Sequence, residues 1–473
     1  MTDATSVRTV RQPGSDAADL GVLDAAGQLA RGQLSSRELT EAYLRRIEER
    51  NGGAPTFDGA PDRINAWVRL YPELAREQAA AADARRAREG DAAPLLCGIP
   101  IGLKDLYAVA GLPLTASSRV LEGNVPAEDS IAYKRLRDHG MVLLGHTHTH
   151  EFAAGGTTDQ AGNPWALDRI VGGSSGGSAA ALAARMTPAA LGSDTCGSLR
   201  IPSACCGTSA IKPTHGLVPL EGVVPLAPTL DHAGPMARTV ADCAAVLAAM
   251  AGGGSLPLGP RAGTRPLDGV TVALTDRVNK IQIDDGVARG FERAVRECER
   301  LGARVVELPA PQTMDWDDLS VVLMTEMWAY HRAHAEQHGL YREQVAEFIE
   351  AAREFTDAQA YTAALQRRAL GTAAWEDWFE REGLDLVLEP TLPILPLERG
   401  PGYDRDHPAG PGDPLIAFTA TWDMTGMPVV CLPTSWCVGM SLVAPRGREA
   451  SLIQAAIDLQ EHALGIPGDP FAR

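Results

Sequence analysis

The 473-residue chain has no long apolar run and no apolar segment near its amino terminus. A membrane-spanning helix needs about 20 consecutive apolar residues, and no run approaches that length. An export signal needs an apolar core, which the polar start MTDATSVRTVRQPGSD does not provide. We therefore expect a cytoplasmic protein with no membrane partner.

Paired cysteines are also missing. None of the eight cysteines forms a C-x-x-C pair, and several lie in apolar runs. This usage is typical of reduced thiols in a cytosolic protein rather than of a disulfide framework.

The chain lacks an excess of positive charge. Its net charge is −17 and its isoelectric point is near 5.1. A protein that binds nucleic acid neutralises phosphates with lysine and arginine, so we expect a small-molecule partner and no nucleic acid. The preference for arginine and the many alanines are typical of a bacterial genome rich in G and C.

Lysine is scarce, with four lysines among 43 lysine and arginine residues. One of them, Lys104, lies in an apolar stretch that predicts a buried strand over residues 99–106. Burial lowers the pKa of a lysine, and a neutral lysine is a competent base, whereas arginine does not give up its proton. The alternative is a lysine held in a salt bridge.

Two clusters of glycine and serine, residues 172–178 and 192–198, are the most informative part of the chain. Glycine-rich backbone can direct several N–H groups at one oxyanion while a nearby serine attacks a carbonyl. The alanine-rich stretch between the clusters predicts a buried helix. The alternatives are a phosphate-binding loop and a flexible linker, but no G-x-x-x-x-G-K-[ST] pattern is present, and a linker would not alternate with an apolar helix.

With these clusters, the sequence resembles the amidase signature family, serine amidohydrolases with a Ser–cis-Ser–Lys triad. Further segments resemble family motifs in the same order along the chain: 98–105, 111–115, 151–153, 163–165, 211–214, 230–236, 425–428 and 442–445.

The resemblance implies a role for each residue of the predicted site. Ser198 would be the nucleophile, Lys104 the base, and Ser174 the bridging serine, placed before a cis peptide bond. The oxyanion hole would consist of the backbone N–H groups of Thr195, Cys196, Gly197 and Ser198. Asp194 and Arg200 would brace this loop.

Two residues depart from the family pattern. Cys196 stands where the family usually has glycine, and Asp423 where it usually has asparagine.

Three histidines at alternate positions, His146, His148 and His150, are a competing signal. In a strand they would lie on one face, as metal ligands do in some hydrolases, so a metal-dependent amidohydrolase is a second enzymatic class. No H-E-x-x-H or distant carboxylate pattern completes such a site. We therefore expect neither a metal nor another cofactor.

The expected fold is α/β, the amidase-signature fold, with a large mixed β-sheet core surrounded by α-helices. Helices are predicted over 36–50, 72–88, 130–139 and 285–301, and strands over 99–104, 141–144, 269–275 and 303–308. We expect a single domain over residues 1–473, with its motif core at about 95–250 and 385–460.

A helical segment over about 312–382 resembles the family least and holds 10 of the 24 aromatic residues. Most of these are explained by helix packing. The functional interpretation is that some line a substrate channel. The four candidates are Trp316, Trp328, Trp375 and Trp378.

The sequence thus predicts an amidase that cleaves the C–N bond of linear uncharged amides or carbamates, as aryl acylamidases and urethanases do, with activity extending to esters. The alternative is the glutamine amidohydrolase subunit of a tRNA-dependent amidotransferase. A binding protein that has lost catalysis is the third class, which the complete triad disfavours. We expect a monomer or homodimer.

Overall fold

The computed structural model describes residues 16–253, 258–259, 263–311, 315–400 and 413–472. Residues 312–314 of the predicted helical segment and the polar start lie outside these ranges.

The described strands form one eleven-stranded sheet with the order β1-β3-β2-β4-β6-β5-β10-β11-β9-β7-β8. The strands are β1 (Trp67–Leu70), β2 (Pro100–Lys104), β3 (Val142–Thr147), β4 (Ala189–Asp194), β5 (Ser209–Lys212), β6 (His232–Ala237), β7 (Thr271–Thr275), β8 (Arg304–Leu308), β9 (Leu386–Pro390), β10 (Val429–Ser435) and β11 (Val438–Val443).

The sheet is mixed. Strand β2 runs parallel to β3 and β4, and β7 runs parallel to β8 and β9, whereas the remaining pairs are antiparallel. Buried apolar side chains from nearly every strand form one continuous core. The predicted large mixed sheet is confirmed.

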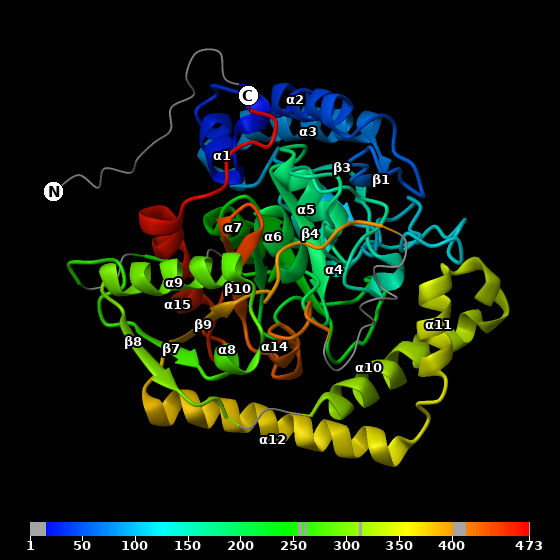
Figure 1. Ribbon diagram of the computed structural model, residues 1–473. Coiled ribbons are helices and arrows are strands. Elements are labelled where there is room, and N and C mark those ends of the chain that lie inside the picture. Colours follow the sequence, from blue (N-terminus) through cyan, green and yellow to red (C-terminus); the bar gives the residue numbers. More distant parts are fainter. Residues whose placement is uncertain (1–15, 254–257, 260–262, 312–314, 401–412, 473) are drawn as a thin grey trace.

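Helices surround this sheet (Figure 1). They are α1 (Val22–Ala30), α2 (Ser36–Arg50), α3 (Pro72–Glu89), α4 (Ile131–Asp138), α5 (Gly176–Ala183), α6 (Arg200–Cys206), α7 (Val240–Met250), α8 (Arg277–Lys280), α9 (Asp285–Arg300), α10 (Trp316–His331), α11 (Glu343–Ala352), α12 (Ala358–Glu382), α14 (Ala420–Met424) and α15 (Glu449–Leu459). Helices α5 and α6 pack on each other and on the central strands.

Local sequence signals account for several of these boundaries. Ser35 accepts a hydrogen bond from the Glu38 backbone N–H, and the Glu38 side chain reaches back to the Ser35 N–H, so a capping box starts α2. The helices predicted over 72–88, 130–139 and 285–301 are confirmed to within two residues, as α3, α4 and α9.

The alanine-rich stretch differs from its prediction. The helix α5 ends at Ala183, and after a turn through Pro188 the chain continues as strand β4. Both elements are fully buried, so the sequence shows neither helical nor strand periodicity there.

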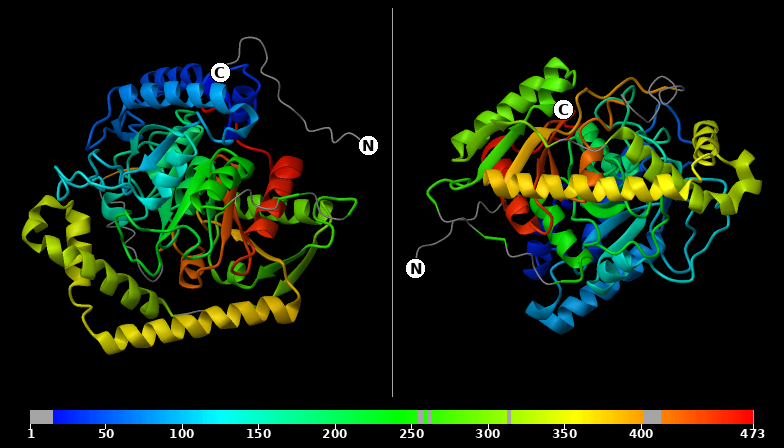
Figure 2. Two further views of the ribbon diagram at one scale, coloured as in Figure 1. Left: turned by 180° about the vertical axis from the view of Figure 1, so that it is seen from behind. Right: turned by 90° about the horizontal axis from the view of Figure 1, so that it is seen from below.

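The aromatic segment is helical, as predicted. Helices α10 and α11 project to one side, and the 25-residue helix α12 returns beneath the molecule toward β7 and β8 (Figures 1 and 2). Together these helices form an arm around the lower edge of the sheet.

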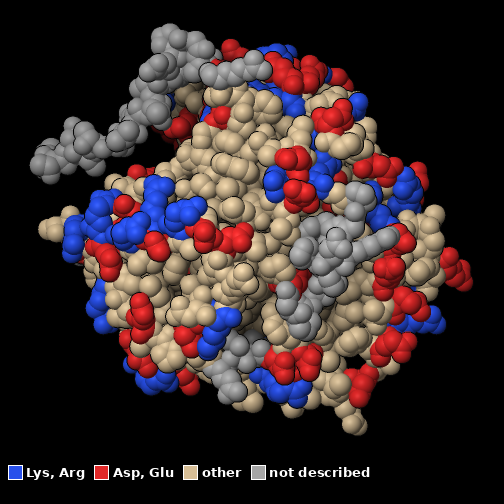
Figure 3. Space-filling view, viewed as in Figure 1, with Lys and Arg blue, Asp and Glu red and all other residues tan. Residues whose placement is uncertain are grey.

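Charges of both signs are interspersed on the face seen in Figure 3. Within the described ranges, no helix combines the length and apolar character required to cross a bilayer.

Candidate active site

The site lies where two neighbouring parallel strands end. Gly102 of β2 pairs with Ala190 of β4, so the carboxyl ends of both strands meet at one edge of the sheet. Strand β2 ends at Lys104 and β4 ends at Asp194. The loop that follows β4 carries Ser198, so the strand register brings the predicted base and the nucleophile loop to the same edge.

Lys104 is fully buried. Its Nζ lies 2.6 Å from Ser174 Oγ and 2.8 Å from Ser193 Oγ. Burial lowers the pKa of Lys104 to about 7, against the opposing effect of the Asp194 and Asp231 carboxylates. A large share of this lysine is therefore neutral at neutral pH, when Nζ can accept a proton from one hydroxyl while it donates to the other.

Ser174 is held by its backbone. Its carbonyl oxygen accepts hydrogen bonds from Thr158 Oγ1 at 2.9 Å and from the His150 N–H at 3.0 Å. The cis peptide bond joins Gly173 to Ser174. The expectation that Ser174 precedes the cis bond was therefore wrong, since Ser174 follows it.

Ser198 lies just before α6 and is 7% exposed. Its carbonyl oxygen accepts a hydrogen bond from the Ser175 N–H at 3.2 Å, which ties the two glycine and serine clusters together. The Lys104 and Ser174 side chains are thus in direct contact. The loop that carries Ser198 is held beside them by the backbone hydrogen bond to Ser175.

The loop between β4 and α6 is fixed by Asp194. The carboxylate accepts hydrogen bonds from the Gly197 N–H and the Leu199 N–H. Gly197 was predicted to donate to the oxyanion, but its N–H is occupied by Asp194. The other three members of the predicted set are the N–H groups of Thr195, Cys196 and Ser198.

Gly197 also requires the absence of a side chain. Its φ is 134°, and a Cβ there would lie 2.5 Å from Thr419 Oγ1. Thr419 Oγ1 itself donates a hydrogen bond to the Cys196 carbonyl oxygen. The segment before α14 thus packs directly against the loop between β4 and α6, residues 195–199, which we call the oxyanion loop.

A buried ion cluster braces the loop from behind. Arg200 donates to both Asp194 oxygens, at 2.8 and 3.0 Å, and to Asp423 Oδ2 at 2.5 Å. All three side chains have no exposed surface. Burial opposes ionisation of Asp194, but the neighbouring Arg200 holds the pKa of that carboxyl below its usual value. The side-chain contacts agree with the bracing role expected of Asp194 and Arg200.

The three histidines do not share one strand face. Strand β3 ends at Thr147, so only His146 lies within it. The nitrogens of His146 contact the Tyr71 hydroxyl and the Tyr107 carbonyl, and those of His148 contact Ser117 and Thr56. Within the ranges that the structure describes, no group of three histidine, cysteine or acidic side chains is arranged to hold a metal ion.

The four tryptophans fall into different environments. Trp375 and Trp378 are buried in an aromatic core with Trp422, so their prediction as channel residues was wrong. Their i, i+3 spacing on α12 turns both to the core. Trp328 packs against a second apolar cluster under the Arg353 guanidinium. Trp316 is only partly buried.

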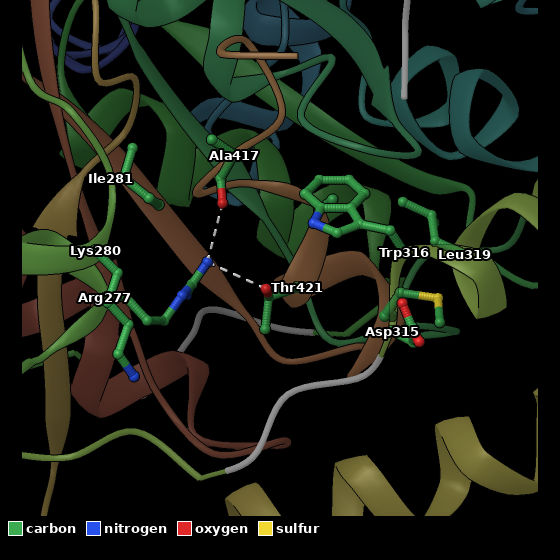
Figure 4. Close-up of a pocket in the computed structure, with 10 residues that line it drawn as sticks. Arg277, Lys280, Ile281, Asp315, Trp316, Leu319, Ala417 and Thr421 are labelled. Atoms are coloured by element: carbon green, nitrogen blue, oxygen red, sulfur yellow. Dashed lines mark hydrogen bonds between the residues drawn. The ribbon is translucent and has the colours of Figure 1, made fainter. Parts of the chain in front are cut away.

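Trp316 lines a cavity of about 280 Å³ beside α14 (Figure 4). On the opposite wall, Arg277 donates hydrogen bonds to the Ala417 carbonyl oxygen and to Thr421 Oγ1. The cavity lies within one helical turn of Thr419, the residue that contacts the oxyanion loop. Of the four candidates, Trp316 is the one that lines this cavity.

Substituting the tryptophans should separate these roles. Trp375→Ala removes a fully buried ring and should lower the free energy of unfolding by about 3–5 kcal/mol. Trp316→Ala should preserve stability better and should shift the preference between aryl and alkyl amides by about 10-fold. Thermal unfolding and a two-substrate assay measure both effects. A uniform change for every amide would exclude Trp316 from the channel.

Two contacts of the candidate site were not predicted from the sequence. Ser193 belongs to the second serine cluster, but its hydroxyl contacts Lys104 Nζ only because β2 pairs with β4. Asp231 accepts a hydrogen bond from Thr195 Oγ1 at 2.6 Å, which fixes the start of the oxyanion loop. Its position in the motif 230–236 was the signal that could have found it.

Comparisons with known proteins agree with this geometry. A family model described as Amidase matches residues 38–453. A glutamyl-tRNA(Gln) amidotransferase subunit from Roseiflexus castenholzii is 34% identical over 96% of this chain and 95% of its own length.

Solved structures are similar over nearly the whole chain. The peptide amidase of Stenotrophomonas maltophilia is 28% identical, with a TM-score of 0.76, over 96% of this chain and 98% of its own. The 6-aminohexanoate cyclic dimer hydrolase is 26% identical, with a TM-score of 0.80, over 95% of this chain and 98% of its own.

Proposed function

Since this chain belongs to the amidase family, we propose that it hydrolyses an amide C–N bond through an acyl-enzyme on Ser198. The observation that carries the proposal is the 2.6 Å contact between Lys104 Nζ and Ser174 Oγ in a fully buried site. A buried lysine with a lowered pKa next to a serine is a base poised for proton transfer.

The proposed reaction begins with a proton relay. Neutral Lys104 takes the proton of Ser174 as Ser174 takes the proton of Ser198, whose oxygen attacks the substrate carbonyl. Ser193, at 2.8 Å from Nζ, steadies the lysine as its charge develops. The relay then runs backward and protonates the departing amine, because an amide leaves poorly as an anion.

The negative charge on the carbonyl oxygen would be stabilised by backbone N–H groups of Thr195, Cys196 and Ser198. Such donors are effective because they are already oriented before the charge develops. Water then hydrolyses the acyl-enzyme by the same relay. A carbamate substrate would follow the same route and release carbon dioxide from the resulting half-ester.

Two substrate classes fit this chemistry. The sequence predicted linear uncharged amides or carbamates, and the similarity to a peptide amidase and a cyclic dimer hydrolase supports a free-standing amidohydrolase. The curated relatives are subunits of glutamyl-tRNA(Gln) amidotransferases, and they support the second class more closely. In that class the amide is glutamine, and the chain works with partner subunits on a tRNA.

The amine released from each of four substrates, ammonia or a substituted amine, decides between the two classes. Purified protein is given glutamine, a neutral primary amide, an anilide and a carbamate at equal concentrations. Preference for glutamine by at least about 10-fold, enhanced by partner subunits, would establish the amidotransferase class. Turnover of the neutral substrates without release of ammonia from glutamine would establish the free-standing amidohydrolase.

The relay predicts that chelation has no effect. Incubation with EDTA should leave the rate of amide hydrolysis unchanged, because the attacking group and the base are both side chains of this chain. The rate is compared before and after dialysis against the chelator. Activity that disappears and returns with zinc would instead support the metal-dependent class considered for the histidines.

A further inference from the structure

A second buried lysine, Lys212, lies behind the oxyanion loop and has no part in the relay. It ends strand β5 and has no exposed surface. Its Nζ lies 3.1 Å from His232 Nε2 on the adjacent strand β6, and 3.5 Å from the Pro213 carbonyl oxygen. A buried ammonium is costly unless it is paired, so this lysine needs an explanation.

His232 connects Lys212 to the ion cluster. The groups that Nδ1 faces, the Asp423 carboxylate and the Asp194 carbonyl, are acceptors, so Nε2 accepts from Lys212 and the proton of neutral His232 lies on Nδ1. That nitrogen is 3.4 Å from Asp423 Oδ1 and 3.3 Å from the Asp194 carbonyl oxygen. Burial, followed by the neighbouring Lys212, keeps the pKa of His232 well below its usual value. The imidazole is therefore a neutral bridge.

The ion cluster itself is short of one positive charge. Arg200 is a single cation between the carboxylates of Asp194 and Asp423, and all three are inaccessible to water. Within the described part of the chain, Asp423 Oδ1 has no conventional hydrogen-bond partner, and His232 Nδ1 faces it. A net charge in such a place is strongly unfavourable, so a compensating proton or cation is required.

We infer that Lys212 is the counter-cation of Asp423, coupled to it through His232, and that this balance positions Arg200 and with it the oxyanion loop. The inference rests on the proposed function, because it assigns Lys212 a positioning role behind that same site.

The contacts that run from Lys212 through His232 to Asp423 also allow one proton to be shared along this line. If the Lys212 proton moves to His232 Nε2 while the Nδ1 proton moves to Asp423 Oδ1, lysine and aspartate both become neutral and the total charge is unchanged. Burial lowers the pKa of Lys212 to about 7 and raises the pKa of Asp423 well above its usual value. Opposite shifts of this kind agree with a single proton serving the pair.

Three other ionisable groups face the line. His215 packs edge-on against His232 with ring centres 5.1 Å apart. Glu449 accepts a hydrogen bond from the Thr214 N–H at 2.9 Å, and Arg368 donates to the Asp423 carbonyl oxygen at 3.3 Å. These hydrogen bonds join Glu449 and Arg368 to backbone groups and not to the Asp423 carboxylate. Lys212, by contrast, contacts His232, and His232 contacts the Asp423 carboxylate.

A double-mutant cycle tests the pairing. The variants are Lys212→Met, Asp423→Asn and the two together, with Lys134→Met at an exposed lysine as the matched control. Two readouts are measured across pH: the thermal midpoint and the rate at which a fluorophosphonate labels Ser198. Labelling needs no knowledge of the substrate, and the thermal midpoint needs no reaction at all.

Lys212→Met alone should lower the labelling rate by about 10-fold or more, since it leaves Asp423 without its counter-cation. The loss should grow as the pH rises toward about 7, because Asp423 without its partner then ionises, and should grow no further above that pH, where Lys212 of the wild type is itself neutral. The double variant should return to within about threefold of Asp423→Asn, and its thermal midpoint should recover in parallel.

Independent, additive effects of the two substitutions would overturn the inference, as would a Lys212→Met variant that behaves like the Lys134→Met control. If Lys212→Met yields no folded protein, recovery of soluble protein in the double variant supports the pairing and failure to recover it refutes the pairing. If Ser198 is never labelled, the proposed function is wrong, but the thermal cycle still decides the charge pairing.

Discussion

Replacing Ser198 with alanine should lower amide turnover by about 10⁴-fold or more and abolish labelling by a fluorophosphonate. The hydroxyl is the only group of the proposed relay that forms a covalent bond with the substrate, and the loss of such a nucleophile leaves only the contribution of binding and the oxyanion hole. Intact-mass spectrometry after labelling, followed by peptide mapping, identifies the modified serine.

Ser435→Ala is the matched control, because Ser435 is exposed at the end of β10, where the chain turns into β11. It should retain full labelling and turnover. The assignment of the nucleophile fails if the Ser198→Ala protein still accepts the probe at another serine, such as Ser174 or Ser193.

Replacing Lys104 with arginine should lower turnover by at least about 10²-fold, although the positive charge is kept. Arginine does not supply a neutral base, and its longer side chain must fit a site with no exposed surface. Lys134→Arg, at an exposed position, is the control and should be silent. Circular dichroism verifies that the Lys104 variant is folded.

The role of Lys104 as a base also predicts how activity changes with pH. The folded pKa of Lys104 is lowered to about 7, so the lysine is protonated and inactive below that pH. The value of kcat/KM for the wild type should therefore rise with pH through about 7 and then level off. A rise centred near the ordinary lysine pKa of 10.5 would mean that burial does not tune this group.

Leaving-group chemistry offers a second check on Lys104. An anilide needs its nitrogen protonated as it departs, whereas a p-nitrophenyl ester releases a stable anion. Lys104→Ala should therefore impair anilide cleavage more than ester cleavage. Equal losses on both substrates would give the lysine a structural role.

The buried lysine and the two serine clusters that meet at the candidate site could be predicted from the sequence, because the proposed chemistry depends on residue type. Lys104 stood out as a lysine in an apolar strand of an arginine-rich chain. The Lys212 and His232 contact could not be predicted in this way, because it depends on how β5 and β6 pair across a 20-residue separation.

The remaining differences have local physical causes. Apart from the partly exposed Arg185, residues 179–194 are buried, so no polar face marks where α5 ends and β4 begins. Gly197 was expected to bind the oxyanion with its neighbours, but the aspartate three residues earlier captures its N–H. The direction of one N–H group depends on backbone angles that residue type alone does not specify.

The order of strands in the sheet dictates when it can be completed during synthesis on the ribosome. Strands β7 and β8 reach the amino-terminal strands only through β9, β11 and β10, which are made last. A nascent chain that ends with α12 therefore carries two sheet fragments, each with an open edge at β5 or β7. Open edges invite pairing between chains. Residues 386–443 thus act as the closing piece, and truncation before them should give aggregates rather than a smaller enzyme.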